Sequence, residues 1–89
     1  MKKSHEKRCG EIMEILHEWH SPEAVRILAA MGVSERNWKF FMLHSGLADG
    51  KAWSFREIAD KDGVISRVRA YQIVKNTEKR LRLYLESLK

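Results

Sequence analysis

The segment from Ser54 to Arg82 constrains the fold more than any other part of the chain. It opens with Ser54-Phe55-Arg56-Glu57, in which glutamate follows a serine by three residues, as in the capping box that begins a helix. Gly63 is suited to end this short helix, because glycine readily takes the left-handed conformation found after a last helical turn. A second helix begins near Ser66 and continues toward the C-terminus. The segment therefore predicts a short helix, a tight turn and a long helix.

Elsewhere the apolar residues recur at spacings of three and four and do not alternate with polar ones, which indicates helices and no strands. We expect an all-α fold of about five helices. The first runs from about His5 to His20, the second is opened by Ser21-Pro22 and ended by Gly32, and the third is opened by Ser34 and ended near Gly46. The two helices described above complete the set.

The 89 residues predict a single domain with a modest core. Residues 1–33 form an N-terminal helical pair, and residues 34–89 carry the remaining three helices. The third helix is expected to lie at the centre of the core, because its apolar residues are the most aromatic of the chain: Trp38, Phe40, Phe41, Leu43 and Leu47. Trp53, in the loop before the fourth helix, either packs on the last helix or faces a partner.

The last helix carries one long apolar stripe, made of Ala70, Ile73, Val74, Thr77, Leu81, Tyr84, Leu85 and Leu88. Its end can pack on the first helix or pair with a second copy in a homodimer. Packing within the chain is favoured, because the first helix needs a partner for its own stripe of Cys9, Ile12, Ile15, Leu16 and Trp19.

The net charge of +5 is concentrated in one segment. Residues 51–82 contain nine lysines and arginines against four acidic residues, whereas residues 1–50 contain seven of each. A field of one sign favours a polyanionic partner, although a solvated helix face gives the same count.

The arrangement of small and apolar residues in this segment is typical of a helix-turn-helix. Ala59 is the small residue where the two helices cross, and Gly63 lies in the turn. The anchors that usually follow six and nine residues after this glycine would be Arg69 and Gln72, which are poor core residues. Ala70 and Ile73 fit one step later, so the turn is expected to be one residue longer than usual, with Ile65 as the extra residue.

The outward face of the last helix then holds Arg67, Val68, Tyr71, Gln72, Lys75 and Lys79. Arginine can make paired hydrogen bonds to guanine and glutamine to adenine in the major groove. Lysines and helix caps more often hold phosphates, which fix register. The pattern predicts sequence-specific binding of double-stranded DNA and regulation of transcription, with residues 66–79 in the major groove. A homodimer would read two half-sites about one DNA turn apart.

Residues 34–82 also resemble the C-terminal domain (region 4) of sigma-70-type RNA polymerase sigma factors, which reads the −35 promoter element. The likeness begins at Ser34-Glu35-Arg36 and continues through GLADGKAWSFREIADKDGV, of which the Gly-Leu-x-Asp-Gly loop is the most specific part. It ends in Arg67-Val68-Arg69-Ala70-Tyr71-Gln72-Ile73, where the family has Arg-Glu-Arg-Ile-Arg-Gln-Ile.

This resemblance implies a sigma region 4-like helix-turn-helix with two extra N-terminal helices, either in a freestanding domain of bacterial or phage origin or in an excised fragment. It implies contact with RNA polymerase through the third helix and the loop after it. Val68 replaces the family's glutamate and Tyr71 its arginine, so the fold carries over better than the base preference. The alternative is a protein-interaction module that keeps the sigma-like fold and binds RNA polymerase or a sigma factor.

The outward face of the last helix and the resemblance together indicate which residues contact DNA. The base-contacting residues are Arg67, Val68, Tyr71 and Gln72. The phosphate-contacting residues are Ser54, Arg56, Ser66, Arg69, Lys75 and Lys79.

Other chemistry is not expected. His5 and Cys9 could form one metal-binding pair and His17 and His20 another, but the pairs lie about 18 Å apart on a helix, too far to share one ion. No nucleophile with an adjacent base and no phosphate-binding loop is present, so we expect neither an enzyme nor a cofactor. With no signal peptide or membrane span, the sequence predicts a cytoplasmic protein.

Overall fold

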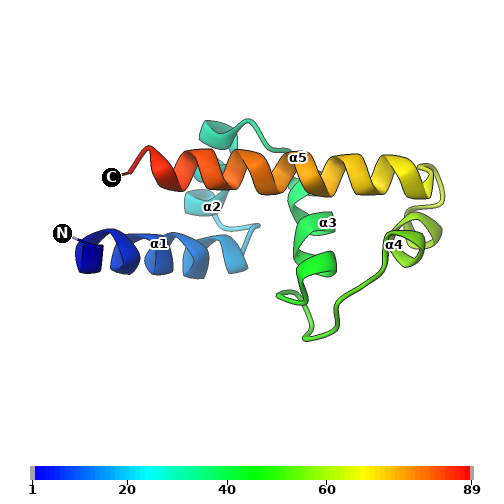
Figure 1. The fold of residues 1–89 in the computed structure, drawn as a ribbon, viewed down its shortest axis with the longest axis horizontal. Helices are drawn as coiled ribbons and strands as arrows, with labels where there is room; N and C mark the ends of the chain where they lie inside the picture. Colours follow the sequence, from blue (N-terminus) through cyan, green and yellow to red (C-terminus); the bar gives the residue numbers. More distant parts are fainter. Residues whose placement is uncertain (1, 89) are drawn as a thin grey trace.

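The computed structural model describes residues 2–88, which form five helices and no strand. These helices are α1 (Lys2–His17), α2 (Pro22–Met31), α3 (Glu35–Ser45), α4 (Phe55–Asp62) and α5 (Arg67–Glu86). The expected all-α class is confirmed. α5 extends along the length of the molecule, with α1 and α2 beside its C-terminal half and α3 and α4 beside its N-terminal half (Figure 1). Within the described range, no helix is both long enough and apolar enough to cross a lipid bilayer.

Serines begin the four helices that follow α1, as the sequence predicts. The hydroxyl oxygens of Ser21, Ser34, Ser54 and Ser66 each accept a hydrogen bond from the backbone N–H three residues later. Each bond satisfies a donor that has no partner within its helix. The expected glycines end α2, α3 and α4. Local sequence therefore sets where these helices begin and where three of them end.

Two expectations about the first and third helices were wrong. α1 ends at His17 rather than His20, because Glu18 to His20 form a turn whose hydrogen bonds lead into the cap of α2. Leu47 lies beyond the end of α3 and is 44% exposed, so it is not a core residue. Gly46 ends α3 at Ser45 by adopting a left-handed conformation, and this redirects the chain before Leu47 is reached.

The core consists of two apolar clusters joined by α3 and α5. The first cluster comprises Leu16, Ala24, Leu28, Met31, Val33, Trp38, Met42 and Leu81. The second comprises Phe40, Leu43, Ile58, Ala70, Ile73 and Val74. Phe41 and Ala48 pack against both clusters. The third helix is therefore central to the core, as expected, and it holds the two ends of the molecule together.

Trp38 is the largest fully buried side chain of the described core. Its indole Nε1 donates a hydrogen bond of 3.0 Å to the backbone oxygen of Leu16, near the end of α1. This bond satisfies the indole inside the core and ties α3 to α1, which are far apart in sequence.

The C-terminal part of α5 packs within the chain. Leu81 belongs to the first cluster, and Tyr84 and Leu85 pack against that cluster, as do Ile12 and Ile15 of α1. Arg80 adds a polar contact, because its guanidinium donates to the backbone oxygen of Met31 at the end of α2. In the stripe proposed as an alternative dimer face, Leu81 is buried, whereas Tyr84, Leu85 and Leu88 are only partly buried.

Replacing Trp38 with phenylalanine should lower the free energy of unfolding by about 2–3 kcal/mol, because it removes a buried hydrogen bond and leaves a void. Trp53→Phe is the matched control, because its Nε1 donates to Asp49 at an exposed position, and it should cost about 1 kcal/mol or less. Urea denaturation followed by circular dichroism measures both. Equal losses would contradict the central role of Trp38.

Candidate nucleic-acid interface

The turn between α4 and α5 is held by hydrogen bonds to the last residues of α4. Gly63 takes a left-handed conformation with φ of 76°, and its N–H donates to the oxygen of Ala59 at 2.9 Å. The carboxylate of Asp62 accepts from the N–H groups of Val64 at 3.3 Å and Ile65 at 3.2 Å. Ile65, which the sequence predicts to be an extra residue, packs against the second cluster. The start of α5 is therefore fixed relative to α4.

The rear face of α5 is anchored in the core by Ala70, Ile73, Val74 and Thr77, all of which are buried. This confirms Ala70 and Ile73 as the anchors in place of Arg69 and Gln72. The Thr77 hydroxyl donates to the backbone oxygen of Ile73 at 2.8 Å, so its burial leaves no unsatisfied polar group.

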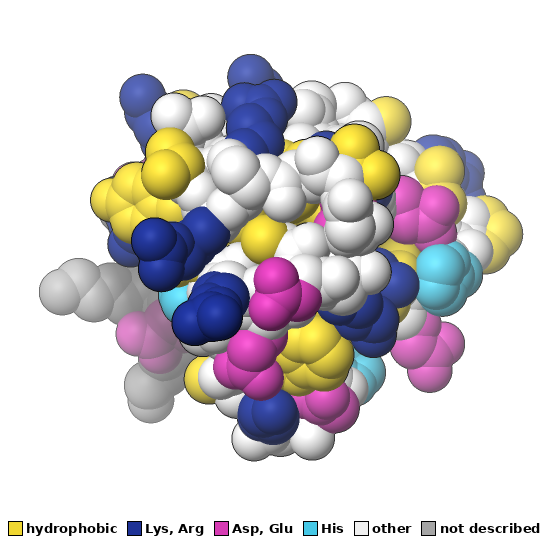
Figure 2. Space-filling view, turned by 90° about the vertical axis from the view of Figure 1, so that its right-hand side faces the viewer, with side chains coloured by type: hydrophobic (Ala, Val, Ile, Leu, Met, Phe, Trp, Pro, Cys, Tyr) yellow, Lys and Arg dark blue, Asp and Glu magenta, His cyan; other side chains and the backbone are white. Residues whose placement is uncertain are grey.

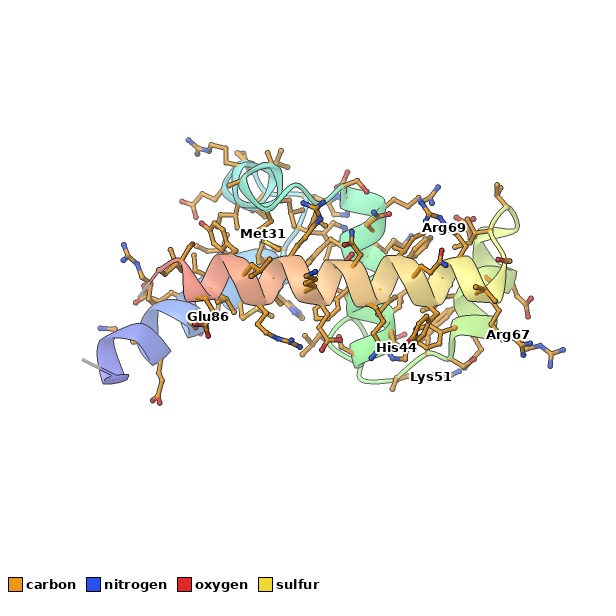
Figure 3. The ribbon with its side chains drawn as sticks, turned by 45° about the horizontal axis from the view of Figure 1, so that its top comes forward. Met31, His44, Lys51, Arg67, Arg69 and Glu86 are labelled. Atoms are coloured by element: carbon orange, nitrogen blue, oxygen red, sulfur yellow. The ribbon has the colours of Figure 1, made fainter. Side chains whose placement is uncertain are left out.

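All the residues of α5 that the sequence assigns to DNA are exposed, namely Arg67, Val68, Arg69, Tyr71, Gln72, Lys75 and Lys79. At about 100° per residue, Val68, Gln72, Lys75 and Lys79 lie opposite the buried face. Arg67 and Arg69 flank this row on opposite sides of the helix (Figure 3). We call the row and its flanking arginines the outer face of α5.

Tyr71 is oriented by an aromatic stack from α3 and α4. Its ring meets the ring of Phe55 edge to face, with centroids 5.2 Å apart, and Phe55 in turn stacks on His44 at 4.2 Å. Tyr71 remains 48% exposed, so it is only partly free to meet a partner. Sequence reasoning missed His44, because its contact with Phe55 joins residues that no helical spacing relates.

The start of α4 is a complete capping box. The Ser54 hydroxyl accepts from the N–H of Glu57 at 3.1 Å, and the Glu57 carboxylate accepts from the N–H of Ser54 at 3.0 Å. Lys51 Nζ also donates to this carboxylate at 3.0 Å. The hydrogen bond from the Ser54 backbone, followed by that from Lys51, lowers the pKa of Glu57 from its ordinary value of 4.5. The Ser54 N–H is thus occupied, and its hydroxyl hydrogen is the group that can reach a phosphate.

Trp53 packs against the second cluster from the loop between α3 and α4. Its N–H donates to the oxygen of Leu43 at 3.0 Å, and its indole donates to the Asp49 carboxylate at 3.2 Å. The ammonium groups of Lys61 and Lys51 lie 4.8 and 5.5 Å from its ring centroid. Of the two places expected for Trp53, the structure favours packing within the chain, because three members of the second cluster, Ala70, Ile73 and Val74, belong to α5.

A groove of about 670 Å³ lies where α4 meets the start of α5. It is lined by Arg56, Ala59, Asp60, Gly63, Ile65, Ser66 and Arg67. Arg56 and Ser66, assigned to phosphates, are thereby brought together with Arg67, assigned to a base. Asp60 is the one acidic side chain among these lining residues. No sequence spacing predicts this groove, because it forms only where two helices cross.

Lysine and arginine side chains surround the upper and left parts of the end face formed by α4 and the start of α5, with hydrophobic side chains between them (Figure 2). Acidic side chains gather lower on this face. Glu78 pairs with Arg82 at 3.0 Å and lies 3.9 Å from Lys75. In the part of the chain that the structure describes, no carboxylate pairs with Arg56, Arg67, Arg69 or Lys79. These cations are available to a polyanion.

The histidines near the N-terminal helices are separate from this interface. His20 Nδ1 contacts the Glu35 carboxylate, and the His5 side chain lies outside the described part of the structure. Among the described side chains, no three histidine, cysteine, aspartate or glutamate residues are grouped so that they could hold a metal ion.

No family model, no characterised protein sequence and no solved structure significantly matches this chain. A function for the outer face of α5 is therefore argued from its own residues.

The lowered pKa of Glu57 predicts a pH-dependent contribution to stability. A carboxylate whose pKa is lower in the folded state stabilises the protein above pH 4.5, and this contribution is lost as the pH falls through the lower folded value. Glu57→Gln keeps the shape of the capping box but removes the charge. The melting temperature of the wild type should exceed that of Glu57→Gln at neutral pH, and the difference should vanish in acid. A constant difference across the pH range would contradict the assignment.

Proposed function

We propose that this chain binds double-stranded DNA sequence-specifically and regulates transcription, through a helix-turn-helix made by α4 and α5. The observation that carries the proposal is the outer face of α5, where Arg67, Arg69 and Lys79, which pair with no described carboxylate, and Gln72 stand away from a buried apolar face. An α-helix fits the major groove, and base edges there present a distinct pattern for each base pair.

The roles of the residues follow from their positions. Gln72 lies in the centre of the outer face and can pair with adenine, while Arg67 at the first turn can pair with guanine. Lys75 and Lys79 continue the same row and are assigned to phosphates. Arg56 and Ser54 at the start of α4 are assigned to phosphates on the other side of the turn. Arg69 and Ser66 are assigned to phosphates at the start of α5.

The sigma region 4-like interpretation forms part of the proposal. It is supported by the order of the elements, which is α3, the loop at residues 46–54, the capped α4 and then α5. The exposure of Leu47 in that loop supports a second contact, with RNA polymerase. Burial of an exposed leucine against a partner would stabilise such a complex. A protein-interaction module of the same fold, without DNA binding, is the second candidate, and the same leucine supports it.

Fluorescence anisotropy with a random-sequence duplex pool at increasing salt separates the two candidates. DNA binding should weaken steeply with salt, by a slope of about 0.9 in the logarithmic plot for each phosphate contact. Lys79→Ala should remove one phosphate contact, and so reduce the slope by about 0.9. It should also weaken binding to all sequences alike. Arg26→Ala is the control, because it removes an exposed cation from α2, outside α4 and α5. It should change neither the salt slope nor the affinity.

Arg67→Ala should act differently from Lys79→Ala. It should weaken binding to the preferred duplex by about 1–3 kcal/mol and relax selection at one base position. Selection of duplexes from a random pool by both proteins, followed by sequencing, measures this change. Equal losses on preferred and random DNA would overturn the role of Arg67 in reading a base.

Absence of DNA binding even at low salt would overturn the proposal. In that case capture of purified RNA polymerase by the wild type, and its loss in Leu47→Asp, would support the interaction module.

A further inference from the structure

We propose that Val68 is a specificity-determining residue that selects thymine, by packing its methyl groups against the 5-methyl group in the major groove. The inference rests on the proposed DNA binding and deepens it. The inference assigns a base to Val68, the one residue of the outer face whose side chain cannot form a hydrogen bond.

Val68 is placed where a base edge would lie and is left open to solvent. Its side chain is 64% exposed in the first turn of α5, on the side opposite the buried Ala70 and Ile73. Valine has a lower helix propensity than the long polar residues beside it. Exposure of its methyl groups to water is also unfavourable. A partner that covers this side chain would therefore gain stability from burying its methyl groups.

The surroundings of Val68 identify that partner as a polyanion with a methyl group. Among residues 67–80 of α5, the side chains that share its side are Gln72, Lys75 and Lys79, and Arg67 precedes it. None of these is acidic, and Arg67 and Lys79 have no carboxylate partner. Thymine alone carries a methyl group on its major-groove edge, and small apolar side chains recognise thymine through it.

The spacing along α5 places this thymine near the base read by Gln72. Val68 and Gln72 are four residues apart, or about 6 Å along the helix axis. Successive base pairs are separated by about 3.4 Å. The preferred site should therefore contain a thymine within one or two base pairs of the adenine contacted by Gln72.

The test begins with the duplex selected by the full chain from a random pool. Each thymine of that duplex is replaced in turn by deoxyuridine, which differs only in lacking the methyl group. The wild type should lose affinity at one position near the Gln72 contact, by about fourfold, the factor that corresponds to one buried methyl group.

Val68→Ala should discriminate less between the thymine and deoxyuridine duplexes at that position than the wild type does, because alanine lacks the two methyl groups of valine that would meet the thymine methyl. Val25→Ala is the matched control, because Val25 is also an exposed valine, 50% exposed, but lies on α2. It should keep the wild-type discrimination. Circular dichroism melting of both variants checks that they fold, which is expected for substitutions of exposed residues by a better helix former.

The outcomes separate this inference from the proposed function. A preferred duplex with no sensitivity to methyl removal, or discrimination that persists undiminished in Val68→Ala, overturns the role of Val68 and leaves the DNA-binding proposal intact. Binding without any preferred sequence overturns the inference and sequence specificity together. No binding at low salt overturns both proposals. Weakening of the thymine preference in Val68→Ala alone supports the inference.

Discussion

The burial of one face of α5 against α3 and α4 is the constraint on which the rest of the structure depends. Ala70, Ile73 and Val74 lie in the second cluster, and Leu81 lies in the first, so a single helix closes both ends of the core. Since side chains at these spacings share one side of a helix, their burial forces the intervening residues outward. The outer face is thus determined by the same residues that stabilise the fold, and it cannot rotate without exposing the core.

The orientation of α4 against α5 depends on small side chains and on local hydrogen bonds. Ala59 and Ala70 are both buried, and their size allows the two helices to approach closely. The carboxylate of Asp62 and the hydroxyl of Ser66 then satisfy backbone donors on either side of the turn. This combination sets the groove between the helices, which brings Arg56 and Arg67 to its rim. Larger residues at the crossing would separate those arginines.

The features that the sequence predicted correctly are those that depend on near neighbours. The serine caps, the glycine ends, the capping box of Ser54 and the anchors Ala70 and Ile73 all follow from spacings of a few residues. The misplaced Leu47 shows the limit, because an apolar residue after a glycine cap is no longer held on the helix face. The stack of His44, Phe55 and Tyr71 and the place of Trp53 could not be predicted, because they depend on how three elements meet.

In the proposed complex with DNA, affinity and selectivity would have different physical sources on the outer face of α5. Lys75 and Lys79 have long flexible side chains, which suit phosphates, because a phosphate contact requires charge more than exact position. Arg67 and Val68 follow the Ser66 cap directly, and their backbone is fixed by the turn and by the burial of Ala70. Reading a base requires such fixed placement, since hydrogen bonds and methyl contacts fail at small displacements. If the proposed function holds, the sequence preference should therefore be set by the first two turns of α5, and the later turns should contribute mainly charge.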